Sequence, residues 1–243
     1  MELREVLAKV FSEDLETLEL FITKKVINTI NPHSYCEAKK DNVFTKALLD
    51  SDVLLPDGSG IVLAAKILTG KKISKIAGAD IHQYLLEQAN KNGKKVFYLG
   101  ASQNTLNLIE KRIQKEFPNI KVASYSPPYK AEFSEKETSA MISAVNRFNP
   151  EVLFVGMTAP KQEKWVYAHK DKVNAKVITS IGAVFDFYAG TVKRSHPFWI
   201  KLGLEWLPRL VKEPKRLFYR NFVSTPKFLL ELISFKLFGR GIL

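Results

Sequence analysis

The stretch Val53-Leu54-Leu55-Pro56-Asp57-Gly58-Ser59-Gly60 decides the fold, because it joins an apolar run to an acid and two glycines. A short apolar run bounded by Pro, Asp and Gly predicts a strand that ends in a turn. In an open α/β sheet, ligands bind outside the carboxyl ends of the strands. Asp57 is therefore a candidate reactive group at such an edge, and the alternative is an ordinary turn aspartate.

The same strand pattern recurs along the chain and alternates with helical patterns. The predicted strands cover Lys25–Thr29, Asp52–Leu55, Lys95–Leu99, Lys121–Tyr125, Val152–Val155 and Lys176–Ser180. Helical spacing of apolar residues covers Ser59–Leu68, Asp80–Asn92, Thr105–Glu116, Glu135–Arg147 and Lys161–His169. This alternation predicts an α/β fold with a Rossmann-like, mostly parallel sheet and helices on both faces.

Composition and length indicate one globular domain with an appendage. The chain has 243 residues, of which 46% are hydrophobic and 26% charged, enough for one large core. Because strand patterns stop near Phe198, we expect a Rossmann-like domain over residues 1–197 and a helical appendage over residues 198–243. Pro208, Pro214 and Pro226 are expected to divide the appendage into short helices.

Neither end of the chain predicts a membrane-spanning segment. The apolar segment 228–238 is only about half the ~20 residues that a spanning helix needs, and it contains two charged residues. Residues 1–21 lack the basic and apolar regions of a signal peptide, so we expect a protein that stays inside the cell. The single cysteine, Cys36, excludes an internal disulfide and is expected to be a buried, inert thiol.

Positive charge is concentrated in the last 51 residues, which include the appendage. The whole chain carries +12, whereas residues 193–243 hold eleven Lys or Arg and three Glu, which is +8 and leaves +4 for the rest. Such local basicity indicates an anionic partner, which can be nucleic acid, acidic lipid or a pyrophosphate.

Several separate blocks of sequence occur in the order found in one known family. They are Thr29–Tyr35, the Pro56-Asp57-Gly58 turn, Gly78-Ala79-Asp80, Phe97–Gly100, Pro127-Pro128-Tyr129, Val155–Trp165, Gly182–Gly190 and Gly203–Leu207. Together they resemble the WecG/TagA/CpsF glycosyltransferases, glycosyltransferase family 26. The resemblance implies an inverting hexosyltransferase that moves an N-acetylmannosamine-type sugar, or another hexosamine or uronate, from a UDP-sugar to a polyprenyl-diphosphate-linked saccharide. Its expected role is the synthesis of bacterial teichoic acid, capsule or exopolysaccharide, and thus cell wall biogenesis.

The resemblance assigns catalytic roles to four residues. Asp57 is the expected base, because a carboxylate in reach of the acceptor hydroxyl can take its proton. Thr29 and Asn31 are expected to flank the same cleft, and the alternative for both is helix capping ahead of Pro32. Gln162 is the fourth, assigned to the donor or catalytic site.

A predicted helix start after the strand Val152–Val155 is the expected anion site. The helix is expected over Lys161–His169, with Thr158 or Ala159 near its cap and Pro160 suited to its first turn. Free backbone N–H groups at such a start bind anions, and Lys161 and Gln162 can add donors toward a diphosphate. Trp165, farther along, is expected to pack in the core.

Further residues complete the expected donor site. Gly100 and Gly156 lie in blocks of the resemblance at strand ends. Asp186 is expected beyond the last strand, where it can hold ribose hydroxyls, with a metal ligand as the rival interpretation. Tyr129 either stacks on uracil or anchors a rigid loop. Lys75 stands where many relatives have arginine, so it keeps the charge without the bidentate fork.

No metal or other cofactor is expected. Asp186 has no second acid at DxD spacing, and the four histidines are scattered. The Gly58-Ser59-Gly60 turn imitates a dinucleotide fingerprint, but Leu63 occupies the third glycine position and argues against a redox cofactor.

Aromatic and aliphatic residues interleave with cations over residues 205–220, which is typical of an interfacial amphipathic helix. The resemblance assigns Arg209, Arg216 and Arg220 to the acceptor diphosphate, so a cytoplasmic protein peripheral on the inner face of the plasma membrane is expected. The alternative is a helix packed on the core, or against a second copy of the chain in a homo-oligomer.

Two other function classes remain as alternatives. A nucleic-acid-binding module would use the basic appendage, but no RRM, KH or zinc-finger signature is present, so no nucleic acid is expected as partner. A noncatalytic UDP-binding protein would keep the fold without transfer, and the intact blocks around Asp57 and Gln162 argue against it.

Overall fold

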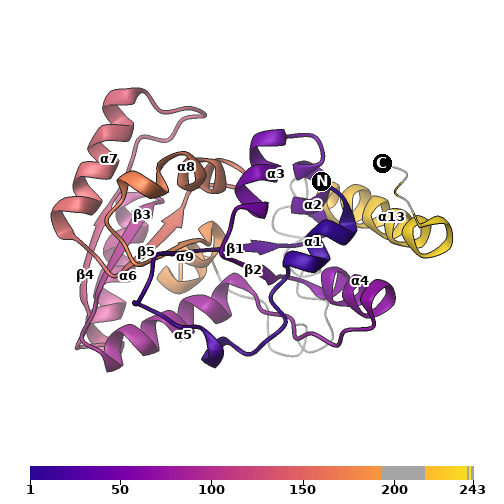
Figure 1. The fold of residues 1–243 in the computed structure, drawn as a ribbon. Helices are drawn as coiled ribbons and strands as arrows, with labels where there is room; N and C mark the ends of the chain where they lie inside the picture. The colour runs from indigo at the N-terminus through magenta and orange to yellow at the C-terminus, as the bar shows by residue number, and fades with distance from the viewer. Residues whose placement is uncertain (193–216, 240, 242–243) are drawn as a thin grey trace.

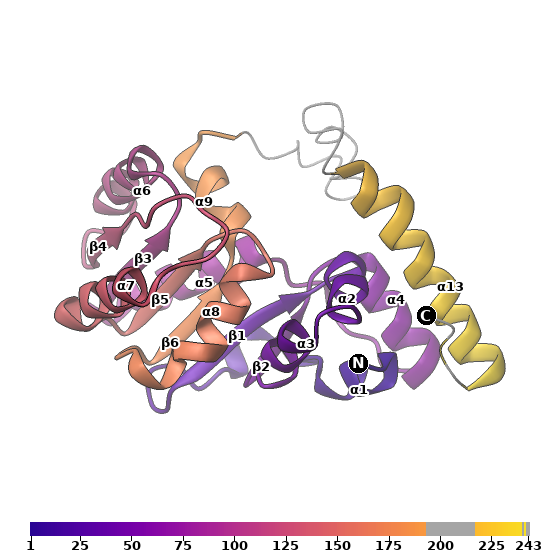
Figure 2. The ribbon, with the colours of Figure 1, turned by 90° about the horizontal axis from the view of Figure 1, so that it is seen from above.

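The computed structural model describes residues 1–192, 217–239 and 241. Figure 1 shows the ribbon. Within the described residues, six strands form one parallel sheet in the order β2-β1-β6-β5-β3-β4, and Figure 2 labels all of them. The strands are β1 (Lys25–Ile30), β2 (Val53–Pro56), β3 (Lys95–Gly100), β4 (Lys121–Tyr125), β5 (Val152–Gly156) and β6 (Val177–Ser180). The predicted Rossmann-like sheet is confirmed, and each predicted strand is present with its limits moved by at most one residue.

Helices cover both faces of the sheet. They are α1 (Leu3–Lys9), α2 (Pro32–Ala38), α3 (Asn42–Leu49), α4 (Ser59–Thr69), α5 (Gly78–Lys91), α6 (Gln103–Glu116), α7 (Glu135–Phe148), α8 (Lys161–His169), α9 (Gly182–Ala189) and α13 (Thr225–Phe238), with the short turns η1 (Leu15–Thr17), η2 (Lys170–Lys172) and η3 (Tyr219–Ser224). One core cluster joins the sheet to α5, α6 and α9, and a second joins it to α7 and α8. A third packs α1, α2, α3, α4 and α13 around the ends of β1 and β2.

Alternation along the strands explains why the sheet is buried on both faces. Val26 of β1 belongs to the cluster under α7 and α8, while the next residue, Ile27, belongs to the cluster under α5, α6 and α9. Successive side chains of a strand point to opposite faces, and strands buried on both faces are apolar throughout. The near-continuous apolar runs in the sequence therefore mark central parallel strands.

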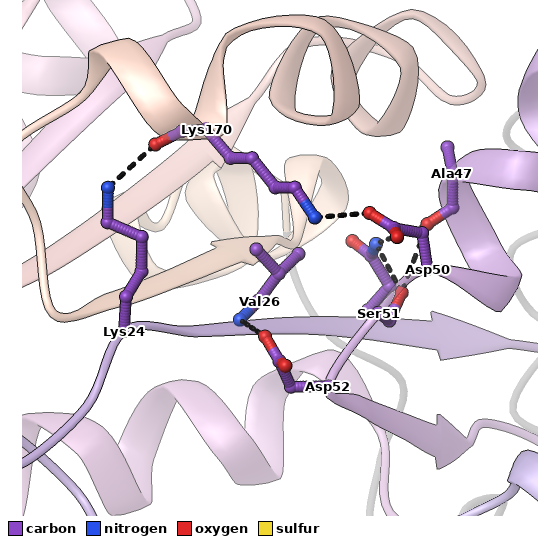
Figure 3. A network of polar contacts seen from close by, with 8 residues as sticks. Lys24, Val26, Ala47, Asp50, Ser51, Asp52 and Lys170 are labelled. Atoms are coloured by element: carbon purple, nitrogen blue, oxygen red, sulfur yellow. Dashed lines mark hydrogen bonds and ion pairs between the residues drawn. The ribbon is translucent and has the colours of Figure 1, made fainter.

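Polar contacts fix the amino-terminal ends of the two strands that lead to the candidate site. Figure 3 shows the Asp52 carboxylate accepting a hydrogen bond from the Val26 N–H, at 2.7 Å, and Lys170 paired with Asp50. These contacts join β1 to β2 and the end of α3 to η2. Because the starts of β1 and β2 are held in register, their carboxyl ends also stand side by side.

The prediction that Pro226 ends a helix is wrong. The chain is helical from Tyr219 through Phe238, and η3, just ahead of Pro226, is a π-helix. A proline cannot donate a backbone hydrogen bond, and its ring crowds the carbonyl four residues earlier. The wider π turn accommodates this conflict, and the Thr225 hydroxyl donates to the Arg220 carbonyl at 3.1 Å. Pro208 and Pro214 lie outside the described residues, as does the expected domain boundary between residues 197 and 198.

The last helix is part of the core. Figure 2 shows α13 running alongside α4 and close to α2. Its inner residues Phe228, Leu232 and Phe235 are buried in the third cluster. Over the described residues, no helix is both long enough and apolar enough to cross a membrane.

Candidate active site at the carboxyl edge of the sheet

Asp57 directly follows β2, at the carboxyl edge of the sheet. Its backbone N–H donates to the carbonyl of Ile30, the last residue of β1, at 2.8 Å. The register that pairs Ile30 with Pro56 places the start of α2 next to this turn. The Asp57 side chain is half-buried. The predicted position of Asp57 at the end of a strand is therefore confirmed.

Asn31 caps the helix that begins beside Asp57. Its Oδ1 accepts hydrogen bonds from the N–H groups of His33 and Ser34, both at 3.0 Å. The turn passes against this residue, since a Cβ on Gly58 (φ 104°) would lie 3.8 Å from the Asn31 Cβ. The capping alternative is thus confirmed for Asn31. It is wrong for Thr29, which lies within β1 and is half-buried.

The loop between α4 and α5 folds back onto the same turn. The N–H of Ile76 donates to the Pro56 carbonyl at 3.0 Å, so Lys75 lies beside the Pro56–Asp57 peptide. Lys75 is exposed. The tertiary structure therefore brings a cationic residue, 18 positions away in sequence, to the edge that carries Asp57.

Gln162 uses both ends of its side-chain amide inside the protein. Its Oε1 accepts from the N–H of Met157 at 3.1 Å and from that of Gly182 at 3.2 Å. Its Nε2 donates to Oε1 of Glu163 at 2.8 Å. Gln162 is buried and joins the end of β5 to the start of α9. It lies at the carboxyl edge, as expected, but its amide holds protein segments together.

Sequence reasoning missed Glu163. This carboxyl is 5% exposed, and burial raises its pKa to about 7, against the opposing effect of the Gln162 hydrogen bond. An acid in the first turn of a helix is ordinarily a solvated partner of the helix dipole. The sequence carries no signal of its burial, which follows from the packing of α8 on the sheet.

The strand-end glycines are required by close packing. A Cβ on Gly100 (φ 122°) would lie 2.3 Å from the Gly156 carbonyl oxygen, and one on Gly156 would lie 2.5 Å from the Phe185 ring. Both residues are buried at the ends of the neighbouring strands β3 and β5. Their position at the carboxyl edge matches the expectation, and their lack of a side chain already has a structural reason.

The other expected donor residues are spread more widely. Lys161 Nζ donates to the Lys130 carbonyl at 2.7 Å and lies over the Phe133 ring, which ties α8 to the loop after β4. Tyr129 in that loop is 98% exposed. Asp186 lies beyond β6, as expected, one turn into α9, and its Oδ1 accepts from the Thr191 hydroxyl at 3.3 Å.

Two predicted core residues are buried, and one predicted helix start is corrected. Trp165 is 6% exposed within the cluster under α7 and α8, and the Cys36 thiol is buried with its pKa raised to about 11 by desolvation. The helix starts at Lys161 as expected, but its cap residue is Pro160 in place of the expected Thr158 or Ala159, so Pro160 lies outside the first turn. Pro160 has a ψ of 4°, which differs from helical backbone.

The C-terminal segment approaches the Asp57 turn. A Cβ on Gly60 would meet Pro32 at 2.5 Å and the Phe228 ring at 3.5 Å, so α13 packs where α4 begins. The His33 Nδ1 lies 2.9 Å from the Ser224 hydroxyl. Of the three expected acceptor arginines, Arg220 is half-buried in η3. Arg209 and Arg216 lie outside the described residues.

The edge carries the Asp57 carboxylate. In the described part of the chain, no group of three or more His, Cys, Asp or Glu side chains is arranged to hold a metal ion. Asp57 lies beside the start of α2, the loop that carries Lys75 and the C-terminal helix α13. This arrangement can perform proton abstraction from a bound hydroxyl.

Comparisons with known proteins agree with one another. Residues 6–241 match the model of the family described as Glycosyl transferase WecG/TagA/CpsF family. A relative from Bacillus subtilis (strain 168) is 34% identical over 209 residues, which is 86% of this chain and 79% of the relative. A relative from Bacillus spizizenii is 32% identical, and the match covers 92% of this chain and 85% of the relative. A relative from Staphylococcus aureus (strain MW2) is 27% identical, and the match covers 94% of this chain and 85% of the relative. All three carry the name N-acetylglucosaminyldiphosphoundecaprenol N-acetyl-beta-D-mannosaminyltransferase.

Proposed function

The chain belongs to the glycosyl transferase WecG/TagA/CpsF family, and we propose that it transfers N-acetylmannosamine from a UDP-sugar to a polyprenyl-diphosphate-linked N-acetylglucosamine. The observation that carries the proposal is the position of Asp57 at the carboxyl edge, combined with relatives that are named for this transfer. The product would serve the synthesis of teichoic acid or a related surface polysaccharide.

The proposed reaction is a single displacement with inversion at the sugar. The acceptor hydroxyl oxygen attacks C1 of the donor sugar, and the Asp57 carboxylate takes the hydroxyl proton. The bond from C1 to the UDP oxygen breaks, and UDP leaves with the electron pair. A base within hydrogen-bond reach typically contributes about 100- to 10,000-fold to such a step. Lys75, on the loop beside the Asp57 turn, would neutralise charge on the departing diphosphate.

The donor would lie across the ends of the central strands. Gly100 and Gly156 end two of these strands, and ligands of parallel sheets occupy this edge. No metal is part of the proposed step, since cationic side chains would carry the diphosphate charge. This remains a prediction that chelation tests.

The outer face of α13 supports contact with a membrane surface. Large apolar side chains are exposed there, among them Leu230, Ile233, Leu237 and Phe238. An apolar groove of about 330 Å³ lies between α4 and α13 and continues this face. Exposed apolar patches of this kind mark interaction sites, and basic residues nearby would add attraction to anionic lipids. A peripheral position on the inner face of the membrane follows from this proposal.

The test is release of UDP by the full-length protein from a panel of UDP-sugars. Reactions run in detergent with and without a short polyprenyl-diphosphate N-acetylglucosamine acceptor, and each is repeated with EDTA. Acceptor-dependent release from UDP-N-acetylmannosamine alone, unchanged by EDTA, is the expected result.

Other outcomes would revise or overturn the proposal. Acceptor-dependent release with a different donor would keep the transferase and replace its sugar. Release that EDTA abolishes would contradict metal independence. Absence of UDP binding would overturn the donor assignment.

A further inference from the structure

A buried series of hydrogen bonds connects three segments that are far apart in the sequence. Glu163 Oε1 accepts from Gln162 Nε2 at 2.8 Å, and Gln162 Oε1 accepts from the N–H groups of Met157 at 3.1 Å and Gly182 at 3.2 Å. This relay ties the first turn of α8 to the end of β5 and to the first residue of α9.

The Glu163 carboxylate dictates how the Gln162 amide is oriented. Oε1 of Glu163 accepts a hydrogen bond from the NH₂ end of the amide, both when the carboxyl is ionised and when its proton is on Oε2. The oxygen end is then left for the two backbone N–H groups. A flipped amide would place its oxygen against the carboxylate and its NH₂ against two other donors. One acid therefore fixes two backbone groups that it does not touch.

The backbone of α9 is shaped for this contact. A Cβ on Gly182 would lie 2.6 Å from Gln162 Oε1, so only glycine allows the amide to approach. The capping residue of α9, Ile181, provides no side-chain acceptor. The free N–H at a helix start is ordinarily satisfied by a capping side chain. Here Gln162, from a different helix, accepts its hydrogen bond.

Burial of Glu163 beside the Gln162 amide has an energetic cost. Its Oε2 is buried and has no hydrogen-bond partner within the described part of the chain. The lysines on either side of it along α8 point elsewhere, Lys161 to the Lys130 carbonyl and Lys164 to Asp41. Burying an acid without a cation opposes folding. Buried acids with perturbed ionisation are concentrated at functional sites.

We infer that Glu163 is a positioning residue for the transfer reaction, which acts through Gln162 to hold the turn after β5 and the start of α9 in place. The strand order puts β6 between β5 and β1, so Gly182 follows the strand adjacent to the one that leads into Asn31. The relay thus fixes the part of the carboxyl edge next to Asn31, and Asn31 in turn lies beside the Asp57 turn. Small displacements of such an edge are enough to slow a reaction about 100-fold.

The inference rests on the proposed function, and its test compares variants in the transfer assay described above. Glu163→Met removes the acceptor with little change in size, whereas Glu163→Gln keeps an acceptor oxygen. Glu163→Met is expected to lower kcat at least about tenfold, and Glu163→Gln is expected to restore most of it. In a Gln162→Met background, Glu163→Met should have almost no further effect, because the linking amide is already gone. Lys164→Met, on the same helix, is the matched control and should keep the kcat of the parent.

Backbone hydrogen exchange gives a second measurement that does not need activity. The N–H groups of Met157 and Gly182 should exchange faster in Glu163→Met than in the parent, and Lys164→Met should leave them unchanged. A parent that transfers sugar, together with a Glu163→Met variant of equal kcat and equal exchange, would overturn the inference and leave the function intact. Losses that simply multiply in the double variant would also overturn it. A parent without transfer would contradict the proposed function, while faster exchange at the two N–H groups would still support the relay.

Discussion

Lys39 Nζ lies 2.6 Å from Oε1 of Glu231, and the Glu231 side chain is fully buried between α2 and α13. The same oxygen accepts a hydrogen bond from the Tyr35 hydroxyl at 3.0 Å. α2 begins at the cap residue Asn31, beside Asp57. The buried acid therefore fastens the C-terminal helix to the element that opens at the candidate site.

Breaking this pair from the lysine side should destabilise the whole domain. Lys39→Met removes a cation paired with a buried carboxylate, which is expected to cost about 3 kcal/mol of unfolding free energy. Urea unfolding followed by circular dichroism measures the change. Lys40→Met is the control, because its partner Glu37 is accessible and such pairs contribute about 0–1 kcal/mol. Equal, small effects of the two variants would show that Glu231 does not need the charge of Lys39.

Asp57→Asn should abolish transfer and leave donor binding in place. The asparagine keeps the size and polarity of the side chain but cannot take a proton, so kcat should fall about 100- to 10,000-fold. Transfer rates and UDP binding by calorimetry are measured together. Asp52→Asn, at the opposite end of β2, is the matched control, since its oxygen can still accept from the Val26 N–H. Turnover near the parent rate in Asp57→Asn would remove Asp57 from the role of base.

The buried Glu163 should make stability depend on pH. Its pKa is raised from 4.5 to about 7 in the folded protein, so the folded state holds a proton that the unfolded state has lost. The resulting stabilisation is complete below about pH 4.5 and is lost as pH rises through 7. At pH 8 the ionised form should cost up to about 3 kcal/mol.

Glu163→Gln tests this dependence. The neutral amide should make the protein more stable than the parent at pH 8, and the difference should shrink toward pH 5. Thermal unfolding over this pH range measures it. A pH-independent difference between the two proteins would contradict a raised pKa at this position.

The outer face of α13 should bind anionic vesicles. Replacing Leu230, Ile233 and Leu237 together by Gln should weaken co-sedimentation with vesicles of phosphatidylglycerol, because buried apolar area drives such binding. These side chains are exposed, so the melting temperature should stay close to that of the parent. Ile22 and Leu108 are exposed apolar residues elsewhere in the protein. Replacing both by Gln is the control for a general loss of hydrophobicity. Unchanged sedimentation of the triple variant would exclude this face as the membrane contact.

Local sequence determined where the strands lie along the chain, where they begin and end, and that Asp57 follows one of them. Apolar runs of four to six residues, bounded by turn residues and alternating with helical patterns, mark the strands of the parallel sheet. Because all strands of a parallel sheet end at one edge, the sequence alone placed Asp57, Asn31 and Gly156 there. The prediction was wrong at Pro226, where a π-helical turn accommodates the proline. Packing of α13 in the core stabilises the continuous helix by more than the low helix propensity of proline destabilises it.

Only the tertiary structure decided what the polar groups behind that edge do. Gln162 and Glu163 have the sequence pattern of a solvated first helical turn, and Glu231 that of a charge on a surface helix. Burial is set by which elements pack together, here α8 on β5 and β6, and α13 on α2 and α4. The direction of an amide and the ionisation of an acid depend on that burial and on partners 20 or 192 residues away. Periodicity carries no information about such partners, so the sequence specified the frame and the packing specified how the candidate site is held.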